Sequence, residues 1–223
     1  MSLKTWSGCE QPGQSPQFGQ HVQLTTLATS DQYAGLYEAV GQESQAELWR
    51  YMPIGPFSAL SEFQNTLSFC QSQHGWEMMA IQATNAARTY LGMAGYMRIR
   101  ATHGSVEVGC VTFSPALQRT PAATEAMYLM AKHVFEDLGY RRYEWKCHDQ
   151  NQASKRAALR YGFQFEGIFR QDMVVKGENR DTAWFAMIDQ DWPRLKAGFE
   201  TWLAPDNFDR QGLQKSTLEA CRT

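Results

Sequence analysis

Apolar positions in the first half of the chain recur with two periods, which predict a strand followed by two helices. Residues 21–27 (HVQLTTL) alternate loosely between apolar and polar side chains, as a strand does. Ser30 and Asp31 stand before a helical stretch over 32–40 that Gly41 ends. Ser58 stands before a second helix. Its apolar stripe at helical spacing belongs in the core and comprises Leu60, Phe63, Leu67 and Cys70.

Three apolar runs follow this helix, and turn residues separate them. The runs are 76–82, 90–100 and 105–113. Asn85 and the pair His103–Gly104 break them in the manner of hairpin turns. The pattern predicts a three-stranded antiparallel meander. Gly92 and Gly95 of the middle strand indicate a bend or a close approach of the backbone.

The second half of the chain alternates between helical and strand periods. A long amphipathic helix over 121–138 keeps apolar residues on one face and stops at Gly139. The later elements are a strand over 140–147, a short helix from Asn151 to Gly162, a strand from 163, a hairpin of 173–175 with 182–188, and a helix over 191–203. The order β-α-α-β-β-β-α-β-α-β-β, with a terminal helix, indicates a mixed α/β domain. We expect the unit from 107 to 147 to be a right-handed parallel crossover.

Composition divides the chain into one domain and two ends. Residues 1–18 are rich in Gln, Ser, Gly and Pro, so we expect a flexible arm. Residues 19–203 carry the periodic elements and form a single domain, because 223 residues with 43% hydrophobic content support one sizeable core. Residues 204–223 lack periodicity, and we expect a loose tail.

Charge and cysteine usage exclude several classes of protein. A formal net charge of -2 provides no general basic field for DNA or other nucleic acids. Five cysteines are scattered without a C-x-x-C pair, which argues against a disulfide framework and a zinc site. No basic segment followed by an apolar run opens the chain, and no stretch approaches the length of a membrane span. These features predict a reduced, cytoplasmic setting.

The turn over 117–123 (LQRTPAA) carries the first candidate chemistry. It opens directly into the long helix, whose first amides have no partner inside the helix. These amides and the helix dipole favour an anion, and Arg119 adds a full positive charge. Thr120 suits an N-cap and Pro121 suits the first helical position, as in any ordinary capped helix. Our interpretation is that this turn holds the pyrophosphate of a nucleotide cofactor.

Three stretches carry short motifs in a fixed order. The stretches are 107–126, with EVG, SP and ATEA; 151–163, with NQAS and GF; and 166–181, with EG, Arg170, KG and RD. Together they make the chain resemble the GNAT superfamily of acyl-CoA N-acyltransferases, and within it the bacterial ribosomal-protein N-terminal acetyltransferases. The resemblance covers roughly residues 20–195. The resemblance implies a three-layer fold, in which helices flank a central mixed, mostly antiparallel sheet.

The resemblance also implies acetyl-CoA as the cosubstrate and no metal. The turn follows the family's Q/R-x-x-G-x-G/A pattern, except that Pro121 replaces the first glycine and donates no amide hydrogen. In the family, the strand before the turn pairs with pantetheine, and Asn151 and Ser154 match positions beside the pantetheine arm and the sulfur. Asn151 equally suits a plain N-cap. The implied cofactor residues are Val111, Thr112, Phe113, Gln118, Arg119, Thr120, Ala122, Ala123, Asn151 and Ser154.

Attack of an amine on a thioester needs a neutral amine and a proton for the leaving thiolate. Two positions that often serve these needs in the family differ here, because Ala158 replaces a tyrosine and Lys146 replaces a glutamate. Glu107, in the family's E-x-G pattern, is the first candidate base and Asp172 is the second. Ser154 is the candidate group near the sulfur. A surface ion pair is the alternative role for Glu107.

Aromatic residues and the final hairpin supply further candidates. Trp49, Tyr51 and Trp184 are expected to line an acceptor pocket, with burial in the core as the alternative for Trp184. Tyr161 occupies an apolar position before Gly162, and we assign it to the core. The pair Arg180–Asp181 is interpreted as a structural salt bridge.

The leading hypothesis is an acetyl-CoA-dependent N-acetyltransferase that acts on a primary amine, as a monomer or a homodimer. The acceptor implied by the resemblance is a protein N-terminus. A small amine or an antibiotic is an alternative, because a fold does not set the acceptor. Ala158, Lys146 and Pro121 also fit a CoA-binding module with little or no catalysis. A structural or partner-binding protein without affinity for acetyl-CoA is the third reading.

Overall fold

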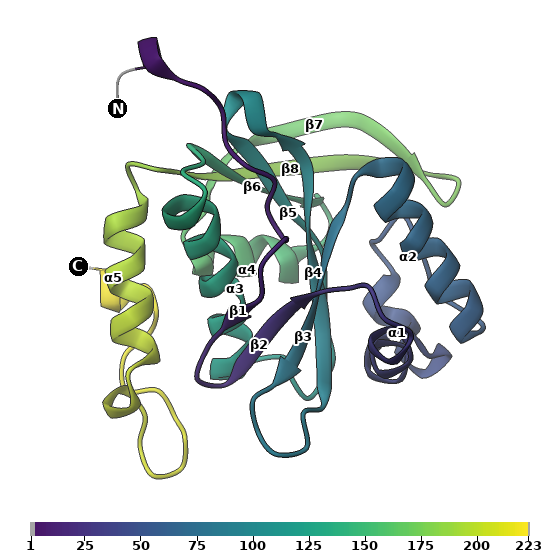
Figure 1. Cartoon of the computed structure of the whole chain (residues 1–223), viewed down its shortest axis with the longest axis horizontal. Helices are drawn as coiled ribbons and strands as arrows, with labels where there is room; N and C mark the ends of the chain where they lie inside the picture. The colour runs from purple at the N-terminus through teal and green to yellow at the C-terminus, as the bar shows by residue number, and fades with distance from the viewer. Residues whose placement is uncertain (1–2, 223) are drawn as a thin grey trace.

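A computed structural model describes residues 3–222 (Figure 1). Its centre is an 8-stranded sheet in the order β1-β2-β3-β4-β5-β6-β8-β7. The strands are β1 (Gln17–Phe18), β2 (Val22–Thr26), β3 (Glu77–Ala83), β4 (Tyr90–Arg100), β5 (Ser105–Phe113), β6 (Arg142–His148), β7 (Gln164–Val175) and β8 (Glu178–Ile188). The helices are α1 (Ser30–Leu36), α2 (Leu60–His74), α3 (Pro121–Lys132), α4 (Gln152–Tyr161) and α5 (Trp192–Leu203).

The sheet is mixed and mostly antiparallel, as the sequence predicts. Strands β5 and β6, which α3 connects, run parallel. The other strand pairings of this sheet are antiparallel within residues 3–222. The predicted strand from 163 and the strand over 173–175 are one long bent strand, β7, because bulges rather than a break separate its two halves.

The central meander β3-β4-β5 forms where the three apolar runs predict it. Its middle strand needs glycine at two positions because of close neighbours. A Cβ on Gly92 would lie 2.5 Å from the Thr112 carbonyl oxygen, and a Cβ on Gly95 would lie 2.5 Å from the Met78 sulfur. The close backbone approach expected at these glycines is confirmed at Gly92, whereas the close neighbour of Gly95 is a side chain.

Two hydrophobic cores fill the two faces of the sheet and give the expected three layers. The larger core joins α3, α4 and α5 to one face and includes Met130 and Phe199. The smaller core joins α1 and α2 to the opposite face and includes Leu36 and Phe63. Figure 1 shows α1 and α2 on one side of the strands and α3 and α5 on the other. Each helix within residues 3–222 is too short or too polar to span a bilayer.

Helix α3 begins as its sequence predicts. The Thr120 hydroxyl accepts a hydrogen bond from the Ala123 amide at 3.2 Å, and Pro121 is the first helical residue. A wide helical turn over His133–Asp137 continues the helix close to its predicted end.

Two other helix starts differ slightly from prediction. Thr29, and not Ser30, caps α1, because its side chain accepts from the Gln32 amide while the Gln32 side chain returns to the Thr29 amide. Ser58 does not cap α2. Its amide and hydroxyl donate to Glu62 at 2.8 and 2.7 Å, and the N-cap residue is Ala59.

Both ends of the chain pack on the domain, so the expectation of a flexible arm and a loose tail was wrong for the described residues. Trp6 donates its indole hydrogen to the Thr102 carbonyl at 2.8 Å, and β1 pairs with β2. In the C-terminal segment Leu218 is fully buried, and Gln214 accepts from the Trp202 indole at 2.8 Å. Single residues such as Trp6 and Leu218 make these contacts. Because such residues do not recur at a fixed spacing, they leave no periodic pattern in the sequence.

Glu125 of α3 ties the edge of the sheet to the helical layer. Its buried carboxylate accepts hydrogen bonds from the amides of Gln20, His21 and Val22 at 2.7, 2.7 and 2.9 Å. Gly19 passes beside it so closely that a Cβ there would lie 2.4 Å from the carboxylate carbon. This contact holds the start of β2 against α3.

Replacing Glu125 with alanine should lower the free energy of unfolding by on the order of 3 kcal/mol, because three backbone amides then lose their acceptor in a largely buried place. Urea unfolding followed by circular dichroism measures the loss. Glu38→Ala, at an exposed helical position, is the matched control and should change stability by less than about 0.5 kcal/mol. Equal stabilities for the two variants would contradict the anchoring role of Glu125.

Candidate active site

The parallel strands β5 and β6 pair over only part of their length. Their register starts at Ser105 of β5 and stops at Val108. Beyond that point β5 continues to Phe113 beside β4, and β6 continues to His148 beside β8. The two strands therefore diverge, and backbone groups that face the gap between them have no strand partner across it.

A bulge in β5 lies where the strands diverge. Cys110 has a positive φ of 49°, and the register of β5 against β4 shifts between Met93 and Gly95. A bulge adds a residue to one strand, bends it and changes the direction of the groups that follow. The stretch 110–113 consequently follows the edge of the gap instead of returning to β6.

A cavity of ≈ 970 Å³ occupies this gap and reaches from the start of α3 to the opposite face of the sheet. We call its two parts the α3 end and the β8 end. Residues at the α3 end include Gln118, Arg119, Thr120, Pro121, Ala123, Asn151, Ser154 and Tyr161. Residues at the β8 end include Tyr51, Trp76, Met97, Arg98, Glu107, Lys146, Met173 and Arg180. The volume is at the upper end of what small-molecule sites occupy.

The α3 end combines a helix N-terminus with cationic side chains. Arg119 adopts a positive φ of 62° immediately before the cap residue, so the turn presents its backbone and guanidinium at the first amides of α3. Arg160 of α4 also lines the cavity and donates to the Thr124 hydroxyl at 3.1 Å. Gln118 donates to the Phe113 carbonyl at 2.8 Å and closes the turn. This end is suited to an anionic group.

The start of α4 brings a hydroxyl to the gap, and the end of β6 brings a thiol. The Asn151 side-chain oxygen accepts from the Ser154 amide at 3.0 Å, which makes Asn151 the N-cap of the helix. The Ser154 hydroxyl accepts from the Trp145 indole at 3.0 Å, so its own hydrogen is directed elsewhere. Burial raises the pKa of the neighbouring Cys147 thiol, and the Ser154 hydroxyl opposes that rise. The thiol is therefore held in its neutral form.

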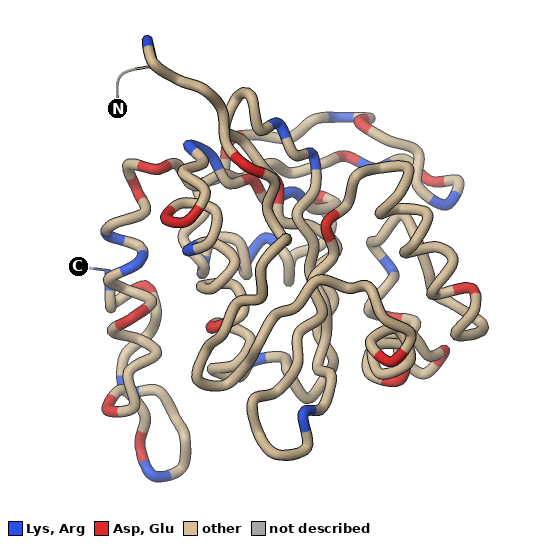
Figure 2. Tube along the Cα trace, in the orientation of Figure 1, with Lys and Arg blue, Asp and Glu red and all other residues tan. Residues whose placement is uncertain are grey.

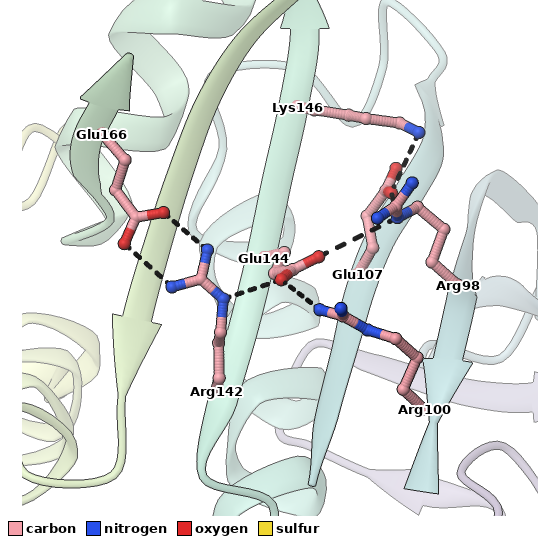
Figure 3. A network of polar contacts seen from close by, with 7 residues as sticks. All are labelled: Arg98, Arg100, Glu107, Arg142, Glu144, Lys146 and Glu166. Carbon is pink, nitrogen blue, oxygen red and sulfur yellow. Dashed lines mark hydrogen bonds and ion pairs between the residues drawn. The ribbon is translucent and has the colours of Figure 1, made fainter. Parts of the chain in front are cut away.

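The β8 end carries a network of charged side chains on β4, β5 and β6 (Figure 3). Glu107 is only 2% exposed, and it forms ion pairs with Lys146 at 3.2 Å and Arg98 at 3.6 Å. Glu144, which is paired with Glu107 across the two strands, contacts Arg100 at 2.9 Å and Arg142 at 2.7 Å. The network places one carboxylate, that of Glu107, at the cavity wall.

The pKa of Glu107 is raised above the ordinary carboxyl value. Burial is the main cause, Lys146 and Arg98 oppose it, and Glu144 adds to the rise. A carboxylate with a raised pKa holds a proton more readily than one in water, which suits a group that accepts a proton during a reaction.

Comparison with known proteins decides the family. The model of the "Acetyltransferase (GNAT) domain" family matches residues 21–164, more than half of the chain. This protein belongs to the GNAT acetyltransferase family.

Solved structures agree with this assignment. The chain is 40% identical to a GCN5-related N-acetyltransferase of Brucella melitensis, with 99% of each chain covered and a TM-score of 0.93. It is 38% identical to a GNAT-family acetyltransferase of Chromobacterium violaceum, with 86% of this chain and 96% of the other covered and a TM-score of 0.80. Ribosomal-protein acetyltransferases of Vibrio cholerae and Salmonella typhimurium share the fold, at 20% identity and TM-scores of 0.65 and 0.63.

A curated relative extends over a shorter part of the chain. The uncharacterized N-acetyltransferase YoaA of Bacillus subtilis is 30% identical over 98 residues, which are 44% of this chain. This chain spans 55% of the length of that relative.

Most of the predicted cofactor residues of this GNAT protein lie along the cavity. Of the ten, Ala122 alone does not line the cavity; its side chain packs against the larger core. Tyr161 belongs to the core, as predicted, and its ring also reaches the cavity wall.

Three other predicted site residues do not reach the cavity. Trp49 is fully buried in the smaller core and donates to the Val40 carbonyl at 2.7 Å, so it cannot meet a substrate. Asp172 lies on the exposed surface of β7, and the strand's alternation turns Met173 to the cavity in its place. Trp184 is buried behind the wall, where it stacks under Arg98 at 4.9 Å and Lys146 at 5.4 Å.

The predicted salt bridge between Arg180 and Asp181 was also wrong. Successive strand residues point to opposite faces, so the two side chains separate. Asp181 accepts from the Gln171 amide and the Asn179 side chain at 2.7 and 2.9 Å. Arg180 turns inward instead and lines the β8 end of the cavity.

Sequence reasoning missed the part that the C-terminal segment takes in the site. Phe208, Leu213 and Gln214 line the α3 end, where Gln214 is held by its bond with Trp202. Lys, Arg, Asp and Glu are interspersed along the chain in Figure 2, and the segment shares that character. The aromatic residues Trp202 and Phe208 are a signal of its docking, and in the structure their ring centroids lie 5.2 Å apart.

Glu144 should be the stabilising centre of the charged network. Its replacement by glutamine leaves Arg98, Arg100 and Arg142 without their shared buried carboxylate. Because these arginines are partly exposed to solvent, the free energy of unfolding should fall by about 1–3 kcal/mol. Chemical denaturation measures the change. Glu166→Gln, on the same network but with a side chain that is 43% exposed, should cost less than about 1 kcal/mol. The reverse order of the two losses would contradict this assignment.

Proposed function

We propose that this GNAT protein transfers the acetyl group of acetyl-CoA to the nitrogen of a primary amine. The observation that carries the proposal is the divergence of β5 and β6. It produces a cavity with an anion-binding helix start at one end and a buried carboxylate at the other. A long, bifunctional cosubstrate fits such a passage better than a compact ligand does.

The cofactor arrangement follows from the groups at the α3 end. The pyrophosphate of CoA would lie at the amides of Ala123 and its neighbours with the Arg119 guanidinium beside it, although Pro121 contributes no amide hydrogen. The pantetheine arm would run between the diverging strands, where its amides can pair with the free backbone groups of Val111 to Phe113. Asn151 and Ser154 lie along the same passage.

The transfer step consists of three changes, which the protein can assist. The amine nitrogen forms a bond with the thioester carbon, the carbon–sulfur bond breaks, and the thiolate gains a proton. Backbone amides at the β5 bulge can stabilise the oxyanion that forms on the carbonyl. Glu107 attracts the ammonium form of the acceptor and takes one proton from it. After the attack the nitrogen releases a second proton, which the Ser154 hydroxyl can relay to the CoA sulfur, because its hydrogen is not used by Trp145.

The acceptor is either a protein N-terminus or a small amine. The likeness to ribosomal-protein acetyltransferases is limited to the fold at 20% identity, so it does not choose between them. Tyr51, Trp76 and Met97 give the β8 end apolar walls that suit an organic side chain in either case. Release of CoA thiol with a panel of amines, followed by mass spectrometry of the products, tests transfer directly. Tight binding of acetyl-CoA without turnover on any amine would indicate a binding module instead.

Removal of the Arg119 guanidinium should weaken acetyl-CoA binding by about 10- to 100-fold, because a charge-assisted contact with phosphate is lost. Arg119→Gly makes this change without backbone strain, since glycine accepts the positive φ. Arg88→Gly is the matched control, because Arg88 also has a positive φ but lies outside the cavity. Calorimetry gives both dissociation constants. An unchanged value for Arg119→Gly would remove Arg119 from the site.

The pH profile should identify Glu107 as the base. Protonated Glu107 cannot accept a proton, so kcat/KM should fall as the pH falls through a pKa that lies above the ordinary carboxyl value. Glu107→Gln should lower kcat by about 100-fold or more and abolish this acidic limb. Glu77→Gln is the control, because burial also raises the pKa of Glu77 but its side chain does not line the cavity. Retention of the limb in Glu107→Gln would place the base elsewhere.

A further inference from the structure

Within the part of the chain that the structure describes, Arg180 is a buried cation without a carboxylate partner. Its residue is 6% exposed, and it lines the β8 end of the cavity. Among residues 3–222 no Asp or Glu lies within ion-pair distance of it. A buried charge without a counterion is costly, so a guanidinium kept in this position points to an anion that comes from outside the chain.

Only part of the guanidinium is engaged by the protein. Nε of Arg180 donates to the Thr182 hydroxyl at 3.3 Å, and Nη1 donates to the Tyr51 carbonyl at 3.5 Å. These long, neutral contacts orient the group without neutralising it. Arginine offers five N–H donors in a planar fork that matches a carboxylate, and several of them remain available to the cavity. Burial lowers the pKa of Arg180, and the charges of Cys147, Glu107 and Asp172 oppose this shift without any carboxylate coming within ion-pair distance among the described residues.

The other cations at this end are already committed. Lys146 and Arg98 both form ion pairs with Glu107 and lie over the Trp184 ring. Each therefore has an anionic partner and an aromatic face to hold it. Arg180 is the remaining buried cation of this wall with no such partner among the described residues.

The sheet places Arg180 and Glu107 on one face. Glu107 is opposite Glu144 on β6, and Lys146, two residues farther on, is opposite Trp184 on β8. Arg180 is four residues from Trp184 on β8, which keeps it on the same face because strand side chains alternate. Arg180 and Glu107 also interact electrostatically. A ligand at this end thus meets a carboxylate and a free guanidinium together.

We propose that the acceptor is an amine that also carries a carboxylate, and that Arg180 binds this carboxylate while Glu107 receives the amine. This inference rests on the proposed transfer to an amine and names the class of acceptor. The two opposite charges of such a molecule match the two charged groups of the wall. Trp76, Met97 and Met173 would contact its apolar part.

Matched acceptors test the proposal in the wild-type protein. The probes are phenylalanine against phenylalaninamide, and the peptide Ser-Glu-Phe-amide against Ser-Gln-Phe-amide, with CoA release as the readout. We expect the carboxylate member of at least one pair to have a kcat/KM about 10- to 100-fold higher. A preference within the first pair would indicate that the acceptor is a free amino acid. A preference within the second pair would indicate that the acceptor is an acidic peptide. No preference in either pair would overturn the proposal.

Variants connect that preference to Arg180. Arg180→Gln should bring the preference close to unity, and Arg180→Lys should retain part of it because the charge remains. Arg170→Gln is the matched control, since Arg170 lies exposed on the neighbouring strand and does not line the cavity. Thermal unfolding and acetyl-CoA affinity of each variant report whether the fold is intact. A full preference in folded Arg180→Gln would overturn the role of Arg180.

Binding of products separates this proposal from the transferase activity itself. N-acetylphenylalanine and N-acetylphenylalaninamide are titrated into the CoA-loaded protein and followed by calorimetry. We expect the carboxylate compound to bind about 10-fold more tightly or better, and to lose this advantage in Arg180→Gln. That result supports the role of Arg180 as a carboxylate receptor, whether or not any amine is turned over. A lack of turnover would count against the proposed transferase activity alone. Equal binding of both compounds would count against Arg180 alone.

Discussion

The loss of pairing between two parallel strands is the constraint on which this molecule depends. Strands β5 and β6 must be joined by a helix because they run parallel, and they must separate beyond Val108 because a bulge at Cys110 bends one of them. The same geometry opens the cavity, exposes backbone groups along its wall and brings the start of α3 to its mouth. The neighbouring pairings with β4 and β8 keep both strands rigid while they diverge.

The charged face of the sheet is the second feature of the site, and it depends on the first. Where α1 and α2 cover the sheet, apolar side chains fill the smaller core. On β5, β6 and β8 the same face carries the buried charged residues Glu107, Glu144 and Arg180. Two of them, Glu107 and Arg180, line the cavity. The ion pairs of Glu144 stabilise the network, whereas Arg180 has no counterion among residues 3–222. Stability and ligand binding thus use neighbouring groups in different ways.

Much of the fold and of the cofactor end of the site was predictable from the sequence. The apolar periods over 90–100 and 121–138 correspond to β4 and α3, and the Thr120–Pro121 start is local chemistry that needs no tertiary information. Glu107 was predicted as a site residue because it matches the family's E-x-G pattern on the strand before the turn, and it lines the cavity. The acceptor end was harder, since Trp49 and Tyr51 are equally aromatic and only packing decides which one is buried.

By itself the sequence determined the order of most elements and the capped start of α3, because each depends on neighbours within a few positions. The predicted cofactor residues came from the resemblance to a family, and most of them line the cavity. Tertiary structure alone decided that the chain ends pack on the domain, that Arg180 leaves Asp181, and that the C-terminal segment reaches the cavity. Those outcomes depend on contacts between residues far apart in the chain. Whether a buried charge is paired depends on residues that are distant in the sequence, and no local sequence pattern reports it.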